Sequence, residues 1–114
     1  MIIGTVRIQP SPERHAAVVE VLQSVQGRVR AQPGCAACDI FDEQGSEPAV
    51  VLIERWETDE ALEEHLRSET YGWVLAAIEL AGRQPDIRFE RVTASEGIEL
   101  VERLRNRCQT TVRR

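Results

Sequence analysis

Apolar and polar residues alternate over Ile2–Gln9, which is the pattern of a strand with one buried face. Three further short segments are rich in apolar or β-branched residues and are bounded by turn residues. Ala49–Trp56 is the most apolar of them, whereas Ile87–Thr93 carries charges on one side. We therefore predict four strands, over Ile2–Gln9, Cys35–Phe41, Ala49–Trp56 and Ile87–Thr93.

Longer segments between these strands carry apolar residues at helical spacing. Three of them follow a hydroxyl residue that can cap a helix, and the first also has proline at the first helical position. A fourth follows the last strand, with a frayed tail expected from Cys108 onward. The predicted helices run from Ser11 to Pro33-Gly34, over Thr58–Arg67, from Ser68 to Gly82 and over Glu96–Arg105.

The order β-α-β-β-α-β with a terminal helix is that of the ferredoxin-like split arrangement, an α+β sandwich. A chain of 114 residues fits one domain. We expect residues 1–94 to form the ferredoxin-like unit, and residues 95–114 to add a helix and tail to the same domain.

A small sheet with helices on one side leaves its other face bare, and soluble monomers rarely expose an apolar patch of that size. The strand Ala49–Trp56 is apolar on both faces, as expected for a strand that is covered twice. We therefore predict a homodimer with more than roughly 1,000 Å² of buried area. The helix Glu96–Arg105 is too short to be stable alone, so it should pack on its own domain or on the dimer mate.

Composition and charge exclude several function classes. The chain has 14 basic and 19 acidic residues and a net charge of -5, so a nucleic-acid partner is not expected. All the basic residues are arginine, which excludes Schiff-base and other lysine chemistry. No apolar run approaches the length of a membrane span, and the N-terminal residues lack the pattern of a signal peptide. The expected location is the cytoplasm, without membrane attachment.

The segment Val51–Tyr71 joins a strand end to a helix and carries the candidate chemistry. His65 falls on the apolar side of the helix, and histidine titrates near the pH at which a base could take a proton from a phenol or quinol. A packed core histidine with one hydrogen bond is the alternative. Glu54 and Trp56 share one strand face, and either face of that strand could line a cavity. A buried Glu54 would need an arginine or a ligand hydroxyl as its partner.

Two aromatic residues follow on the next helix. Tyr71 shares a helical stripe with aliphatic residues, so it should point inward with its hydroxyl available. Trp73 lies off that stripe and suggests a contact with a second copy, because tryptophan is enriched at interfaces. With His65 as the candidate catalytic residue, the candidate substrate-binding residues are Trp56, Tyr71, Glu54 and Trp73.

Cys35 and Cys38 have the spacing of a redox or metal pair, but their context argues against both functions. A zinc site needs a second pair of ligands, which Cys108 and the scattered histidines do not supply. In a regular strand, residues three apart point to opposite faces and lie roughly 10 Å apart, too far for a disulfide. We therefore expect two small buried fillers and no metal site.

The sequence resembles the antibiotic biosynthesis monooxygenase family. The resemblance rests on a strand followed by ERWET, a helix with His65, LRS and an aromatic residue, preceded by Gln32-Pro33-Gly34-Cys35, and it extends from about Ile3 to about Thr93. It implies that two sheets pair into a dimeric barrel with a ligand cavity between each sheet and its helices. It also implies oxidation of quinols, anthrones or related phenols without metal or flavin.

The leading hypothesis is therefore a cofactor-independent monooxygenase that acts on a small phenol, quinol or enol, with oxygen activated by the deprotonated substrate. The alternative from another class is a non-catalytic ligand-binding or interaction module of the same fold. Haem degradation is disfavoured because the resemblance places Thr5 and Leu75 where haem-degrading relatives carry an asparagine and the iron-binding histidine. Isomerisation of a phosphorylated ketone would need cations in the cavity, for which Arg55 and Arg91 are the candidates.

Overall fold

The computed structural model describes residues 1–112 of the chain, and the side chains of residues 1–106. Four antiparallel strands form one sheet in the order β2-β3-β1-β4: β1 (Ile2–Ile8), β2 (Cys35–Glu43), β3 (Ala49–Trp56) and β4 (Asp86–Arg91). The helices are α1 (Pro12–Arg30), α2 (Asp59–Arg67), α3 (Glu69–Ala81) and α4 (Ile98–Val112). None of these helices is both long and apolar enough to cross a lipid bilayer. The element order and the sheet order confirm the predicted α+β, ferredoxin-like fold.

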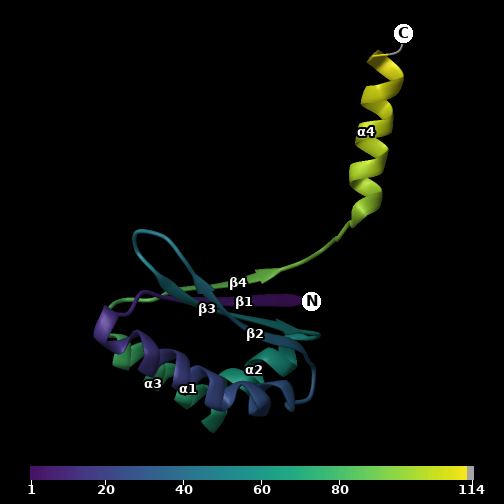
Figure 1. Cartoon of the computed structure of the whole chain (residues 1–114). Helices are drawn as coiled ribbons and strands as arrows, with labels where there is room; N and C mark the ends of the chain where they lie inside the picture. The colour runs from purple at the N-terminus through teal and green to yellow at the C-terminus, as the bar shows by residue number, and fades with distance from the viewer. Residues whose placement is uncertain (113–114) are drawn as a thin grey trace.

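Helices α1, α2 and α3 lie on one face of the sheet, which we call the inner face (Figure 1). The inner-face residues of β3 pair with inner-face residues of β1, so that Val50 lies opposite Ile8 and Leu52 opposite Val6. These side chains are buried, as is the aliphatic stripe of α1. The core therefore lies between the inner face and the three helices. The inner face of β3 consists of Val50, Leu52, Glu54 and Trp56.

The opposite, outer face of the sheet has no helix packed on it in the described part of the chain (Figure 1). In its centre Thr5 of β1 lies opposite Ile53 of β3, and Val51 of β3 lies opposite Phe41 of β2. Thr5, Val51 and Ile53 are half-buried, and Phe41 is exposed. The bare face expected for a sheet with helices on one side is thus present.

The helix ends follow the predicted capping pattern with one exception. Thr58 and Ser68 cap α2 and α3, because their hydroxyl oxygens accept the amides of Ala61 at 3.1 Å and Tyr71 at 3.2 Å. Gly82 ends α3 in the left-handed conformation, with φ of 72°. Ser11 also precedes α1, but its side chain makes no capping hydrogen bond.

Helix α4 differs from the expectation at both ends. It begins at Ile98 rather than Glu96 and continues to Val112, so the tail predicted from Cys108 is helical as far as the structure describes it. No glycine or proline follows Gly97, so no strong helix breaker ends α4 early. The helix stands clear of the sheet and of α1–α3 (Figure 1), so packing on its own domain is not observed. Packing on a second copy remains a prediction.

A β-bulge in β2 changes the expected placement of the two cysteines. The register shifts between Cys35 and Ala37, so that Cys35 lies opposite Trp56 and Cys38 lies opposite Glu54. Since Trp56 and Glu54 share the inner face, both cysteines lie on that face as well. The expectation that they point to opposite faces was wrong, because it assumed a regular strand.

Candidate active site

Three elements bring four of the predicted site residues together on the inner face. The end of β3 supplies Glu54 and Trp56, which are two residues apart and therefore point the same way. Helix α2 supplies His65 and α3 supplies Tyr71. Glu54 is 4% exposed, His65 is 1% exposed, and Trp56 is fully buried. The structure thus selects the inner face of β3 as the face that carries the candidate chemistry.

Glu54 and His65 form a buried acid–base pair. The His65 Nε2 lies 2.9 Å from Oε1 and 3.2 Å from Oε2 of the Glu54 carboxylate. The indole Nε1 of Trp56 also donates to Glu54 Oε1, at 3.1 Å. A buried carboxylate is costly without such partners, and here two ring N–H groups supply them. The partner of Glu54 is therefore a histidine and a tryptophan, not the arginine or ligand hydroxyl expected.

Aromatic rings enclose His65 on two sides. The Trp56 ring stacks on the imidazole, with centroids 4.5 Å apart and planes inclined by 27°. Tyr71 meets the imidazole edge-on, with centroids 5.2 Å apart. Burial, together with the negative charge of Glu54, raises the pKa of Tyr71 above its ordinary value, so its phenol is neutral at physiological pH. No hydrogen bond of the Tyr71 hydroxyl is observed within the described residues.

Two polar residues that the sequence analysis did not assign to the site complete it. Gln32, in the turn after α1, places its Oε1 2.6 Å from His65 Nδ1. Its Nε2 donates to Ser68 Oγ at 3.2 Å, and Ser68 Oγ donates to the main-chain oxygen of His65 at 2.6 Å. No sequence pattern links Gln32 to His65, because the contact depends on how the α1–β2 turn meets α2. Ser68 was identified only as a helix cap.

Both ring nitrogens of His65 are therefore held by the protein. Glu54 holds one nitrogen, as expected of a carboxylate that orients a catalytic histidine. The other nitrogen meets Gln32. A small pocket of about 180 Å³ lies on that side of the ring. Its lining residues are Gln32, Pro33, Ala61, Glu64, His65 and Ser68.

The remaining candidates lie apart from this cluster. Trp73 is 48% exposed on α3 and contacts none of the four clustered residues through a ring or hydrogen bond. Burial raises the pKa of the Cys35 thiol, and burial together with the charge of Glu54 raises that of Cys38 to about 12. Both thiols are free and remain protonated at neutral pH, which suits space-filling better than redox chemistry. The Cys108 side chain lies outside the described residues.

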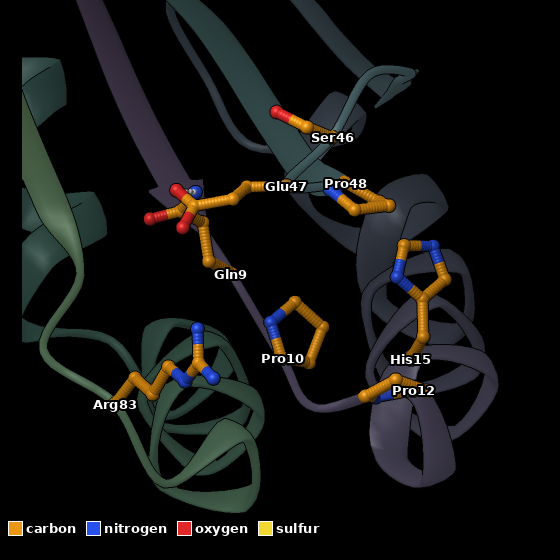
Figure 2. A pocket seen from close by; sticks show the side chains of 8 residues that line it. All are labelled: Gln9, Pro10, Pro12, His15, Ser46, Glu47, Pro48 and Arg83. Carbon is orange, nitrogen blue, oxygen red and sulfur yellow. Dashed lines mark hydrogen bonds between the residues drawn. The ribbon is translucent and has the colours of Figure 1, made fainter.

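A larger pocket, of about 500 Å³, lies at the opposite end of the sheet, where β1 ends and β3 begins. Figure 2 shows Arg83 and His15 on opposite sides of it, with Pro10 between them. Its polar groups are largely paired, because Gln9 donates to Glu47 at 3.3 Å and His15 contacts Asp42 at 2.8 Å. This pocket contains none of the predicted site residues.

The two arginines considered for phosphate binding do not reach the pocket beside His65. Arg91 is ion-paired with Asp59 at 2.7 Å, and Arg55 lies exposed on the outer face of the sheet. Neither lines the pocket at His65. The arrangement therefore does not favour the isomerase alternative, which needs a free cation beside the substrate phosphate.

Comparison with known proteins identifies the family. The sequence profile of the antibiotic biosynthesis monooxygenase family matches residues 1–75, about two thirds of the chain. The chain belongs to this family. The matched region includes α1, the α1–β2 turn and the whole Glu54–His65 cluster, so the geometry described above belongs to the family domain.

Individual proteins of similar sequence or fold agree with this family assignment. YcnE of Bacillus subtilis (strain 168), named as a candidate monooxygenase, is 28% identical over 88 residues, which cover 76% of this chain and 93% of YcnE. Rv0793 from Mycobacterium tuberculosis is 26% identical, with a TM-score of 0.74, over 84% of this chain and 98% of its own. A candidate antibiotic biosynthesis monooxygenase from Deinococcus radiodurans has the same fold at 17% identity, with a TM-score of 0.78, over 86% of this chain and 98% of its own. This chain is longer than these relatives by about the length of α4.

Proposed function

We propose that this protein is a cofactor-independent monooxygenase that acts on a small, electron-rich phenol, quinol or enol. The observation that carries the proposal is the Glu54–His65 pair, an acid–base pair removed from water and flanked by Trp56 and Tyr71. Family membership supports the reaction class. The buried pair supports the proton transfer that such a reaction requires.

Each residue of the cluster has a distinct role in this proposal. His65 takes the hydroxyl proton of the substrate and then stabilises the resulting anion as an imidazolium. Glu54 orients the ring and balances its charge. Trp56 packs against the imidazole and keeps water from its face, and Tyr71 offers its hydroxyl to the substrate. Trp73 serves a contact with the second copy that encloses the site.

The reaction needs no external reductant. The deprotonated substrate transfers electrons to oxygen, and the two combine into a peroxide at the reacting carbon. For an anthrone-type substrate, one oxygen atom then replaces the two hydrogens of that carbon as a carbonyl group, and the other leaves as water. The four electrons that reduce oxygen all come from the substrate. The protein supplies orientation, exclusion of water and stabilisation of the developing charge.

We further propose that the protein acts as a homodimer in the cytoplasm. The uncovered outer face, with Val51 and Ile53 half-buried and Phe41 exposed, supports a second copy packed against it. The free thiols of Cys35 and Cys38 are compatible with a reducing compartment. A small aromatic or quinol-like molecule is the expected ligand of each subunit.

A direct test measures oxygen consumption by protein shown to contain no metal or flavin, with hydroquinones and anthrones as substrates. The His65→Ala variant should lose about a hundred- to ten-thousand-fold in kcat. The matched control is His15→Ala, which removes the only other histidine, pairs with Asp42 far from the cluster and should retain full activity. If the whole panel stays unoxidised, or if both variants behave alike, the proposal is wrong.

One observation favours a second function, a non-catalytic ligand-binding module. Both nitrogens of His65 and the Glu54 carboxylate already have protein partners, which is also the arrangement of a structural polar core. A molecule that purifies with the protein, binds at the pocket beside His65 and is returned unchanged in the presence of oxygen would support this alternative.

A further inference from the structure

The two nitrogens of His65 differ in the kind of partner they have. Nε2 faces both oxygens of Glu54, and a carboxylate only accepts hydrogen bonds, so Nε2 carries a hydrogen. Glu54 is itself held by Trp56 Nε1 at 3.1 Å. Nδ1 faces the side-chain amide of Gln32, the one partner that can offer either an acceptor oxygen or a donor NH₂ group. Nδ1 is therefore the nitrogen whose partner can form a hydrogen bond whether or not that nitrogen carries a hydrogen.

The orientation of the Gln32 amide corresponds to the charged ring. Its Oε1 lies 2.6 Å from Nδ1, an arrangement that suits a hydrogen on Nδ1, whereas the amide NH₂ group in that place would suit a bare Nδ1. If Nδ1 lost its proton, two lone pairs would face each other across this distance. A half-turn of the amide removes that repulsion, because it brings Nε2 to Nδ1 and Oε1 to Ser68.

Ser68 allows this turn without leaving a polar atom unpaired. Its hydroxyl donates to the main-chain oxygen of His65 at 2.6 Å and accepts from Gln32 Nε2 at 3.2 Å. After the turn, the hydroxyl can donate to Gln32 Oε1 instead. The His65 oxygen keeps the amide of Ser68, which donates to it at 3.0 Å. The hydroxyl oxygen still accepts the amide of Tyr71.

The backbone of Gln32 is fixed by two hydrogen bonds, so a half-turn of the amide would leave the main chain in place. Its N–H donates to the oxygen of Val29, and its carbonyl accepts the amide of Cys35, both at 3.1 Å. The pocket of about 180 Å³ has both Gln32 and His65 in its lining, so a small hydroxyl group would approach the buried ring from this side. Nε2 points instead at the buried carboxylate of Glu54.

We propose that Nδ1 of His65 is the nitrogen that receives the substrate proton, and that Gln32 is a positioning residue whose amide turns with that proton. In this step the substrate O–H bond breaks and an Nδ1–H bond forms. The ring changes from neutral, with hydrogen on Nε2, to the imidazolium, and the substrate becomes an anion. The substrate part of the inference rests on the proposed function, whereas the choice of nitrogen does not.

Other ionisable groups surround the ring and have to be separated from its titration. Glu54 and Tyr71 contact His65, and Glu64 lines the same pocket. On β2, Cys38 lies opposite Glu54. From α1, Arg30 binds the main-chain oxygen of Cys38 at 3.0 Å. A probe that reports on the two imidazole nitrogens individually, not on the net charge of the cluster, is therefore required.

The test is nitrogen-15 NMR of histidine-labelled, full-length protein across the titration of His65, without substrate. We expect the neutral form to carry its hydrogen on Nε2 and none on Nδ1. Gln32→Glu should raise the titration midpoint by about one pH unit or more, since a carboxylate only accepts and adds a negative charge. The matched control is Gln23→Glu, which adds the same charge on an exposed position of α1 and should leave midpoint and tautomer unchanged.

A second variant covers the case in which Gln32→Glu does not fold. Gln32→Met keeps the length of the side chain but offers no amide. If the Gln32 amide binds the neutral and the protonated ring equally well, the titration midpoint of His65 in Gln32→Met should move by less than about half a pH unit. If the amide only accepts, it stabilises the imidazolium, and its loss should lower that midpoint by about one unit. A neutral form with hydrogen on Nδ1 would overturn the inference.

Kinetics separates this inference from the proposed function. If the protein oxidises a quinol, the acid limb of the pH profile of kcat/KM should move in Gln32→Glu by the same amount as the NMR midpoint, and should not move in Gln23→Glu. An acid limb that stays in place while the midpoint moves would exclude Nδ1 as the acceptor of the substrate proton. If no substrate is oxidised, the proposed function fails while the NMR result still decides the choice of nitrogen.

Discussion

Gly34 and Ala61 approach so closely that a Cβ added at Gly34 would lie 2.4 Å from the Cβ of Ala61. Gly34 also has a φ of 82°, in the left-handed region where a side chain is strained. Its carbonyl accepts the amide of Glu57 at 2.9 Å. These contacts fix the α1–β2 turn against the start of α2. Gln32 lies in this turn, so the same contacts position its side chain beside His65.

Replacing Gly34 should therefore damage both stability and the site. Gly34→Ala should lower the free energy of unfolding by about 2 kcal/mol or more, because it combines a steric overlap with an unfavourable φ. Gly27→Ala is the matched control, since it lies within α1 with open space around it and should stabilise the protein by about 0.5–1 kcal/mol. Denaturant unfolding of both variants measures the difference. Equal effects at the two glycines would contradict this account of the turn.

Removing His65 should be costly for a reason distinct from catalysis. His65→Ala would leave the buried Glu54 carboxylate with Trp56 as its remaining partner, and loss of one member of a buried pair costs about 3–5 kcal/mol. His15→Ala removes a histidine whose partner Asp42 is exposed, so it should cost about 1 kcal/mol or less. Urea unfolding at neutral pH would distinguish the two. Because His65→Ala will be less stable, its activity has to be measured at a temperature where it is folded.

The fold could be predicted almost completely from periodicity, and the two features that were missed have separate causes. Strand and helix patterns are local, so β3 was predicted at its observed bounds and the caps Thr58 and Ser68 were identified. The bulge between Cys35 and Ala37 was missed because it depends on pairing with β3, which no local pattern in β2 reveals. The end of α4 was predicted too early. No glycine or proline marks a helix end after Gly97, so the sequence did not show where the helix stops.

The sequence analysis identified four of the residues that cluster, but not Gln32 and not the contacts between them. Glu54, Trp56, His65 and Tyr71 were identified from their spacing on a strand face and a helix stripe, and the structure brings them together. Which of them bind one another depends on tertiary contacts between β3 and α2. Gln32 shows this most clearly, because its contact with His65 joins residues 33 positions apart.

The buried thiol of Cys38 predicts a loss of stability at alkaline pH. Its pKa is raised from 9.0 to about 12, mainly by burial, so the folded protein holds this proton after the unfolded chain has released it. Its contribution to stability is therefore complete below about pH 9 and is lost as the pH rises toward 12. Cys38→Ala should weaken the decline in unfolding free energy between pH 8 and pH 11, whereas Cys35→Ala, at a less buried thiol, should change the slope less. An unchanged slope in Cys38→Ala would contradict the assignment.

Helix α4 provides the sharpest test of the proposed dimer. Its apolar residues lie three positions apart along the helix, and Ile98, Val101 and Leu104 are all exposed, with Ile98 at 64%. A helix of this length is marginal in water without a partner, and its own domain supplies none. We therefore expect the second copy to bind this stripe, so that the dimer buries it together with the outer face of the sheet.

Hydrogen exchange and light scattering measure the two parts of that expectation separately. In the native protein the mass should be that of two chains at micromolar concentration, and the amides of α4 should exchange slowly. Val101→Asp and Leu104→Asp should each speed exchange in α4 and weaken the dimer, since a charge on the stripe cannot be buried without a partner. Glu99→Gln, at an exposed position on the opposite side of the helix, should change neither. A native dimer with fast exchange in α4 would leave the sheet as the interface and refute docking of the helix, whereas the mass of a single chain would refute the dimer itself.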